Sequence, residues 1–163
     1  MNGIFIGLGS NLAAPIKQVL MAIKALHALP ETKLIKQSSL YASPPMGPQD
    51  QPDYINAVVE LTSQLSASEL LDQLQTIEQQ QGRVKLRHWG ERTLDLDILV
   101  YGDQEINDER LTIPHPGLTE RAFVLYPLAE ITPDLIIPKL GNVASLVQNC
   151  PRAGLNRINL DLL

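Results

Sequence analysis

The segment TLDLDILV at residues 93–100 decides the fold, because its alternation of apolar and acidic side chains predicts a strand, over 93–101, with two different faces. The apolar face is expected to consist of Leu94, Leu96, Ile98 and Val100. The other face carries Asp95 and Asp97, whose Cα atoms are expected to lie ~6–7 Å apart. This strand is predicted to be the last one of the core.

The two aspartates predict a magnesium site. Aspartate is depleted in strands, and two carboxylates at this spacing repel each other unless water or a cation separates them. Magnesium takes oxygen ligands and completes its coordination with waters and substrate phosphates. The alternative is a half-exposed strand whose polar face carries Asp95 and Asp97 without binding a metal.

The elements predicted upstream complete the order strand, helix, strand, strand, helix, strand. They are a strand within NGIFIGLGS at 2–10, a helix at 15–29, strands at 32–41 and 54–65, and a helix at 67–81. Downstream, a short strand at 105–107 and helices at 119–129 and 143–149 are predicted. This order is that of the ferredoxin-like α+β fold, expected here with a mainly antiparallel sheet and helices on one face. We therefore expect a single domain over residues 1–163 with a C-terminal extension.

Local signals set the expected boundaries of the first two helices. Asn11 is predicted to cap the first helix. The glycines of GLG at 7–9 are interpreted as a turn at the end of the first strand, because the third glycine of a dinucleotide-binding fingerprint is missing. Ser66 and Glu69 form a capping-box signature for the second helix, and Gly82 is predicted to end it.

A basic segment, RVKLRHWGER at 83–92, precedes the acidic strand. Its cations are Arg83, Lys85, Arg87 and Arg92, beside His88 and a single acid, Glu91. This charge pattern suits a confined anion such as a metal–nucleotide complex, in which metals and cations share the phosphate charge. The sequence has no glycine-rich phosphate loop and no protein-kinase motif, so arginines, histidines and metal would hold a triphosphate.

Charge and composition argue against other classes of protein. The formal net charge of −5 opposes binding to nucleic acid and to membrane surfaces. No basic region precedes the apolar N-terminal stretch, and no apolar run approaches the ~20 residues that span a bilayer. One cysteine, Cys150, permits no intrachain disulfide. We expect a cytoplasmic monomer without nucleic-acid or membrane partners.

Aromatic residues make up 4% of the chain, so their positions are informative. Tyr54 and Asn56 share a predicted strand face and, with Phe123, would stack on and hydrogen-bond a flat heterocycle. The alternative places the two aromatic rings in the core and Asn56 on the surface. Trp89 either stacks on a base or an arginine or anchors its loop, and His115 either donates to a phosphate or stabilises a turn.

Together these motifs resemble the 6-hydroxymethyl-7,8-dihydropterin pyrophosphokinase family. The matching segments are GSNL at 9–12, SPPMGPQDQPDYINAVV at 43–59, IEQQQGR at 77–83, RHWGERTLDLDILVYGD at 87–103, RLTIPHP at 110–116 and ERAF at 120–123. The resemblance extends over residues 1–140. It implies transfer of pyrophosphate from ATP to hydroxymethyldihydropterin, which gives AMP and the pterin diphosphate for folate biosynthesis.

The resemblance also implies roles for individual residues. Asp95 and Asp97 match the ligands of two magnesium ions, and with Arg83 and Arg92 they form the implied catalytic set. The implied pterin contacts are Ser43, Pro44, Met46, Tyr54, Asn56, Trp89 and Phe123. The implied ATP contacts are Gln75, Glu78, Lys85, Arg87, Ile98, Arg110, Thr112, His115 and Arg121.

The chain departs from the family pattern at a few positions. Lys85 stands where relatives often carry arginine, and Pro116 where some carry a tyrosine. The loop between Arg83 and Trp89 is about one residue shorter than in relatives. Either Arg87 or His88 can therefore match the cation that relatives carry there.

Two other functions remain open on the sequence. A different two-metal nucleotide enzyme would account for Asp95 and Asp97 but would give no role to the proline-rich loop at 43–53, or to Tyr54 and Asn56 beside it. A non-catalytic ligand-binding module of the same fold would not need the paired aspartates.

Overall fold

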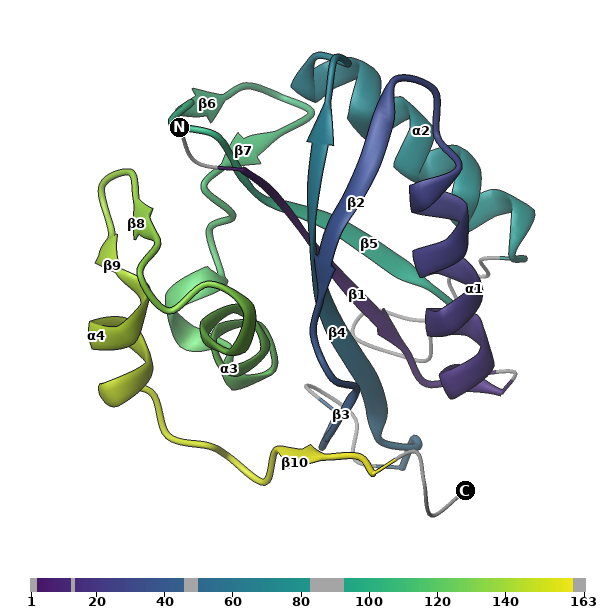
Figure 1. The fold of residues 1–163 in the computed structure, drawn as a ribbon. Helices are drawn as coiled ribbons and strands as arrows, with labels where there is room; N and C mark the ends of the chain where they lie inside the picture. The colour runs from purple at the N-terminus through teal and green to yellow at the C-terminus, as the bar shows by residue number, and fades with distance from the viewer. Residues whose placement is uncertain (1–2, 13, 46–49, 83–92, 160–163) are drawn as a thin grey trace.

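The computed structural model describes residues 3–12, 14–45, 50–82 and 93–159. The core elements are β1 (Ile4–Ser10), α1 (Pro15–His27), β2 (Thr32–Gln37), β3 (Tyr41–Ser43), β4 (Tyr54–Ser63), α2 (Ala67–Gln80) and β5 (Asp95–Tyr101), as Figure 1 shows. The main sheet is antiparallel, in the order β10-β3-β4-β1-β5, where β10 is Asn156–Arg157 and β2 pairs with β4. The predicted α+β fold with a mainly antiparallel sheet is therefore confirmed.

The strand predicted over 32–41 is two strands in the structure. β2 pairs with residues 59–63 of β4, and β3 pairs with residues 54–56. Between them Ser38 N–H donates to Val58 O, and Val58 N–H donates to Ser38 Oγ, each at 2.9 Å. The serine hydroxyl thus takes a hydrogen bond that a strand would give to a backbone carbonyl, which interrupts the pairing.

Helices α1 and α2 pack on one face of the sheet (Figure 1). Their buried contacts come from the apolar stripes that the sequence predicted, namely Val19, Ile23, Leu26, Leu70, Leu74 and Ile77. The prediction that Asn11 caps α1 is wrong, because Ala14 holds the N-cap position and makes no side-chain cap. The side chain of Asn11 instead donates hydrogen bonds to Gln51 and Pro52 in the proline-rich loop.

The expectation that helices cover only one face is also wrong. Helix α3 (Ala122–Ile131) packs against the opposite face, and α4 (Val143–Gln148) packs against α3 (Figure 1). The remaining elements are β6 (Ile106–Asn107), β7 (Thr112–Ile113), η1 (Leu118–Glu120), β8 (Ile136–Ile137) and β9 (Gly141–Asn142). This part of the face needs cover because Phe5, Val58 and Leu99 make it apolar.

A bulge in the pairing of β1 with β5 changes the face of Val100. Ile6 pairs with Ile98, but Phe5 pairs with Val100, so that Leu99 is an extra residue on β5. Ile98 faces α1 and α2 as predicted, whereas Val100 packs with Phe5 on the α3 side. The extra residue shifts the alternation by one position, so the prediction for Val100 is wrong.

The predicted capping box of α2 is confirmed. Ser66 Oγ accepts from Glu69 N–H at 3.1 Å, and Glu69 Oε1 accepts from Ser66 N–H at 2.8 Å. Gly82, with φ +80°, follows the C-cap residue Gln81 and ends the helix as predicted. No helix in the described part of the chain is long and apolar enough to cross a membrane.

Candidate active site

Asn56, Gly9 and Asp95 form one row across three neighbouring strands. Gly9 of β1 pairs with Asn56 of β4 on one side and with Asp95 of β5 on the other. Directly paired residues point to the same face of a sheet, and strands lie ~4.8 Å apart, so the Cα atoms of Asn56 and Asp95 are separated by roughly 10 Å. The next row is Val58, Gly7 and Asp97.

The glycines of β1 lie inside the strand, so the interpretation of residues 7–9 as a turn is wrong. A Cβ atom on Gly9 would lie 3.2 Å from Asn56 Nδ2 and 3.7 Å from Tyr54 Cδ1. A side chain here would therefore occupy the space between Asn56 and Asp95. Because Gly9 has no side chain, only backbone lies between Asn56 and Asp95 in this row.

Asn56 is held in one orientation by Ser43. The side chain is 4% exposed, and its Oδ1 accepts a hydrogen bond from Ser43 Oγ at 2.6 Å. The alternative that Asn56 is a surface residue is therefore wrong. Tyr54, two residues earlier on the same face, and Phe123, at the start of α3, are both half-buried rather than fully in the core.

Asp95 and Asp97 are half-exposed on the same face, as predicted. His115 Nε2 lies 3.9 Å from Asp97 Oδ1, and His115 Nδ1 accepts from Gly117 N–H at 3.1 Å. An Nδ1 acceptor assigns the proton of a neutral imidazole to Nε2, the nitrogen that faces Asp97. Burial lowers the pKa of His115, an effect that Asp97 opposes and Arg121 reinforces.

The backbone between the two aspartates is fixed by Glu78. Glu78 is 5% exposed, and its carboxylate accepts from Leu96 N–H at 2.8 Å. Because β5 ends the strand order on this side, that N–H points away from β1 and has no strand to pair with among the described residues. Glu78 therefore holds the strand that carries Asp95 and Asp97.

Arg121 and Phe123 lie together where α3 begins. The guanidinium of Arg121 is 5.8 Å from the centre of the Phe123 ring. Gly117 makes room for it, since a Cβ atom there would come within 2.6 Å of Arg121 Nε. A cation and an aromatic ring are thus presented by α3 toward the sheet face that carries the aspartates.

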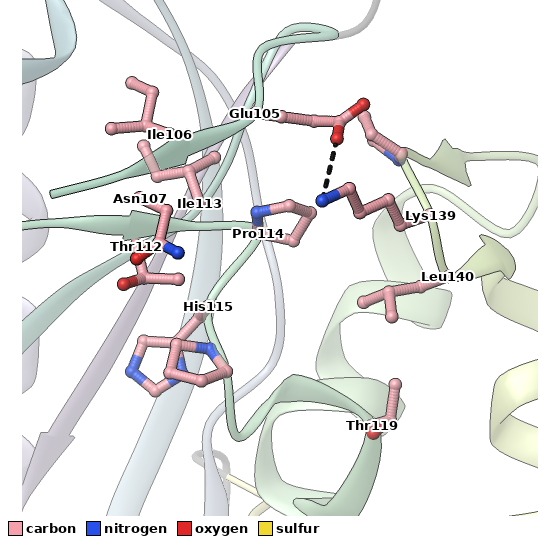
Figure 2. A pocket seen from close by; sticks show the side chains of 12 residues that line it. Glu105, Ile106, Asn107, Thr112, Ile113, Pro114, His115, Thr119, Lys139 and Leu140 are labelled. Carbon is pink, nitrogen blue, oxygen red and sulfur yellow. Dashed lines mark ion pairs between the residues drawn. The ribbon is translucent and has the colours of Figure 1, made fainter.

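Thr112 and His115 line a pocket of about 420 Å³ beside the β6–β7 hairpin (Figure 2). Pro138 and Leu140 also line this pocket. Glu105 and Lys139 also line the pocket, and they form an ion pair at 3.1 Å (dashed in Figure 2).

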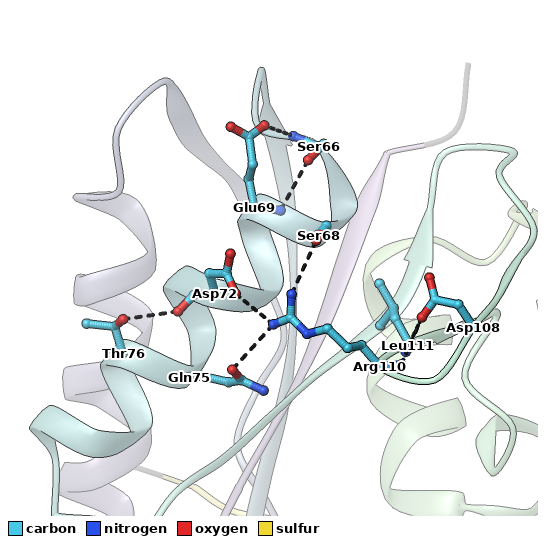
Figure 3. Close-up of polar contacts among 9 residues, drawn as sticks. All are labelled: Ser66, Ser68, Glu69, Asp72, Gln75, Thr76, Asp108, Arg110 and Leu111. Carbon is cyan, nitrogen blue, oxygen red and sulfur yellow. Dashed lines mark hydrogen bonds and ion pairs between the residues drawn. The ribbon is translucent and has the colours of Figure 1, made fainter.

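Arg110 and Gln75 meet on the surface of α2 (Figure 3). Arg110 donates to Asp72 Oδ1 at 2.6 Å, to Ser68 Oγ at 3.3 Å and to Gln75 Oε1 at 3.5 Å. The side chain of Ile98 lies elsewhere, 2% exposed in the core beneath α1 and α2. Only its backbone, on the terminal strand β5, is left for contact with a nucleotide.

Ser43 and Pro44 lie next to each other at the end of β3. Ser43 is buried and Pro44 is exposed. Six predicted site residues lie outside the described residues: Met46, Arg83, Lys85, Arg87, Trp89 and Arg92.

Sequence reasoning missed the link between Asn11 and the proline-rich loop. Asn11 Nδ2 donates to Gln51 Oε1 at 2.9 Å and to Pro52 O at 3.0 Å, and both side chains are buried. The signal in the sequence was a polar amide directly after a buried strand, which suits a cap and a long-range contact equally well.

Comparison with known proteins points to one family. A family model described as 7,8-dihydro-6-hydroxymethylpterin-pyrophosphokinase matches residues 5–133. The 2-amino-4-hydroxy-6-hydroxymethyldihydropteridine pyrophosphokinase of Haemophilus influenzae is 54% identical over 144 residues, which are 88% of this chain and 90% of that protein. The protein of the same name from Pseudomonas aeruginosa is 48% identical over 155 residues, 95% of this chain and 96% of that protein.

Solved structures agree on the fold. The Plasmodium falciparum HPPK-DHPS chain crystallised with pteroate superposes with a TM-score of 0.71 at 15% identity. The match covers 90% of this chain but 42% of that one, so this chain spans less than half of the solved chain. At this identity the likeness supports the shared architecture and no more.

Proposed function

Because the chain belongs to the 7,8-dihydro-6-hydroxymethylpterin-pyrophosphokinase family, we propose that the row of Asn56, Gly9 and Asp95 is where its two substrates meet. The chain transfers pyrophosphate from ATP to hydroxymethyldihydropterin in folate biosynthesis. The reaction joins the hydroxymethyl oxygen to the β-phosphorus of ATP and breaks the bond from that phosphorus to the oxygen that bridges to the α-phosphate, so that AMP and the hydroxyl proton are released.

The pterin lies at the Asn56 end of the row. Tyr54 and Phe123 supply aromatic surface, and the Asn56 amide, which both donates and accepts, matches a ring edge with both kinds of group. The 2.6 Å hydrogen bond from Ser43 supports this assignment, because it fixes which way the amide faces before the substrate arrives. Pro44, Met46 and Trp89 complete the proposed pterin contacts.

Two magnesium ions belong at Asp95 and Asp97 in this proposal. The donor set fits, since both carboxylates lie on one half-exposed face. Magnesium is usually bound through one or two carboxylates together with substrate phosphates, and this pair supplies two carboxylates. Bound magnesium would neutralise phosphate charge and help to align the reacting oxygens.

The phosphates of ATP lie between the aspartates and the start of α3. His115 presents Nε2–H toward Asp97, so it is placed to donate to a phosphate oxygen held there. Arg121 adds positive charge from the same side, where negative charge moves onto the leaving AMP. The other proposed nucleotide contacts are Gln75, Glu78, Arg83, Lys85, Arg87, Arg92, Ile98, Arg110 and Thr112.

The single observation that carries the assignment is the shared row, in which Gly9 pairs with both Asn56 and Asp95. Asn56 is suited to bind a heterocycle, and Asp95 is suited to bind a metal–phosphate complex. The two residues are thereby separated only by the backbone of Gly9. A binding module would not need the acid end of this row, and another nucleotide enzyme would not need the amide end.

The test is to identify the products formed from ATP, magnesium and 6-hydroxymethyl-7,8-dihydropterin by chromatography. The expected products are AMP and the pterin diphosphate, and Asp95→Ala is expected to abolish both. Asp134→Ala, which removes an exposed acid away from the row, is the matched control and should keep full activity. Formation of ADP, or undiminished turnover by Asp95→Ala, would contradict the proposal.

We also propose that the chain acts as a single-domain monomer in the cytoplasm, without nucleic-acid partners. The net charge of −5 and the single cysteine support this. Sedimentation at the enzyme's working concentration should give a mass near 18.0 kDa. A mass twice as large would contradict the monomer.

A further inference from the structure

Residues 150–158 form a C-terminal strap that ends on the edge of the main sheet. Within it β10 pairs with β3, Asn156 opposite Ala42 and Arg157 opposite Tyr41. Ile158 N–H then donates to Leu40 O at 2.8 Å. The strap therefore covers the outer edge of β3, the strand that carries Ser43.

The other end of the strap is fixed to α3. Tyr126 Oη donates to Cys150 O at 2.6 Å, and Arg152 lies over the Tyr126 ring at 5.1 Å. Leu155 is 2% exposed and belongs to the same apolar cluster as the buried residues of α3. The strap thus ties α3, which presents Phe123, to β3, which presents Ser43.

Glu130 joins these three parts. From α3 its carboxylate accepts from Tyr41 Oη at 2.7 Å, from Ser39 Oγ at 2.9 Å and from Ser39 N–H at 3.1 Å. Arg157 of the strap lies 3.4 Å from the same carboxylate, whose side chain is 24% exposed. A charged acceptor with several donors from separate segments fixes their positions more firmly than neutral hydrogen bonds do.

The strap also touches the chain just beyond Ser43. Gly154 has φ +82°, and a Cβ atom there would lie 3.0 Å from Pro44 Cγ. The backbone of the strap therefore packs closely against a residue of the proposed pterin site. A substitution at Gly154 would disturb both the strap's conformation and this contact.

We propose that Glu130 is a positioning residue that, with the strap, sets the separation between the two walls of the pterin site. One wall is Ser43 and Asn56 on β3 and β4, and the other is Phe123 on α3. The inference rests on the proposed function, because it takes these residues as pterin contacts. Neither Glu130 nor the strap belongs to the proposed nucleotide contacts, so pterin affinity should respond separately from ATP affinity.

The first test compares Glu130→Ala with Glu130→Gln in steady-state kinetics on the full-length chain. Glu130→Ala removes the hydrogen bonds that join α3 to Ser39 and Tyr41. It should raise the KM for the pterin about three- to tenfold while the KM for ATP stays unchanged. Glu130→Gln keeps an acceptor for Tyr41 or Ser39 and should restore part of the pterin affinity. If Glu130 had only a structural role, Glu130→Ala would lower the melting temperature and the active fraction of the protein, and hence the apparent kcat. It would not raise the KM for the pterin while leaving the KM for ATP unchanged.

The second test removes a backbone hydrogen bond of the strap. It tests the same proposal even if Glu130→Ala does not fold. Ile158→Pro removes the N–H that donates to Leu40 O, and Ile158→Val keeps both the N–H and most of the packing. Ile158→Pro should raise the KM for the pterin alone, and Ile158→Val should behave as wild type.

Asn56→Ala serves as the reference for a direct pterin contact. If it raises the KM for the pterin but the Glu130 and Ile158→Pro variants do not, the role of the strap is overturned and the proposed site stands. If those variants raise the KM for both substrates equally, the strap is a general stabiliser and the inference is also overturned. If Asn56→Ala leaves the pterin KM unchanged, the assigned pterin site fails and the inference fails with it.

Discussion

Asn56 and Asp95 lie on one face of the sheet in a single cross-strand row, with only Gly9 between them. The row joins a buried amide, oriented by a neighbouring hydroxyl, to a half-exposed carboxylate. Because the intervening residue has no side chain, the two groups face a common space.

Gly9→Ala should impair pterin binding without unfolding the protein. The new methyl group would lie 3.2 Å from Asn56 Nδ2 and would occupy the space that we assign to the substrate. We expect the KM for the pterin to rise about tenfold or more, equivalent to ~1.4 kcal/mol. Gly3→Ala is the control, because the three atoms nearest to its Cβ all belong to the flexible side chain of Glu60. Unchanged pterin kinetics in Gly9→Ala would contradict the assigned site.

Ser43→Ala should weaken pterin binding through Asn56. The substitution removes the hydroxyl that donates to Asn56 Oδ1, so the amide loses its fixed orientation. A net loss of ~1 kcal/mol corresponds to a rise of about fivefold in the KM for the pterin. Ser43→Thr retains the hydroxyl and should stay near wild type. Equal effects of the two substitutions would show that the hydroxyl is not responsible.

Glu78→Leu should disturb the strand that carries the aspartates. The buried N–H of Leu96 would lose its acceptor, at a cost of ~1–3 kcal/mol in the free energy of unfolding, measured by urea denaturation. Because Leu96 lies between Asp95 and Asp97, the magnesium concentration for half-maximal activity should rise as well. Glu78→Gln keeps an oxygen acceptor and should recover most of the stability. Wild-type magnesium dependence in a folded Glu78→Leu variant would argue against this role.

Asn11 and Gln51 should be energetically coupled although they are 40 residues apart in the chain. In a double-mutant cycle with Asn11→Ala and Gln51→Ala, we expect a coupling of about 0.5–3 kcal/mol in the free energy of unfolding. The same cycle with Asn11→Ala and Thr76→Ser, a surface substitution on α2, should be additive. Additivity between Asn11 and Gln51 would mean that the hydrogen bond does not anchor the loop in solution.

The capping box of α2 should contribute stability that depends on pH. Hydrogen bonds from the Ser66 backbone and hydroxyl hold the pKa of Glu69 below its usual range. Its contribution is therefore fully present above the unfolded-state pKa and is lost as the pH falls through the lower folded-state pKa. The difference in the free energy of unfolding between wild type and Glu69→Ala should shrink in acid. A difference that stays constant across this range would contradict the carboxylate's role. Ser66→Ala should cost ~1 kcal/mol at neutral pH.

Local patterns were sufficient for the elements that depend on neighbours in the chain. The Ser66–Glu69 box spans three residues, and the alternation around Asp95 and Asp97 is a property of one strand, so both could be predicted. The face of Val100 could not, because the bulge depends on how β1 pairs with β5. The hydrogen-bond partner of Asn11 could not be predicted either, because it lies in a loop that is distant in the sequence.

The sequence by itself determined the order of strands and helices, the shared face of Asp95 and Asp97, and the family to which they point. These features arise from periodicity and spacing that one segment carries alone. Only the tertiary structure decided that Gly9 separates Asn56 from Asp95, that α3 covers the second face, and that the strap returns to β3 through Glu130. Each of these depends on which segments pack or pair across long stretches of chain, and no local pattern specifies such partners.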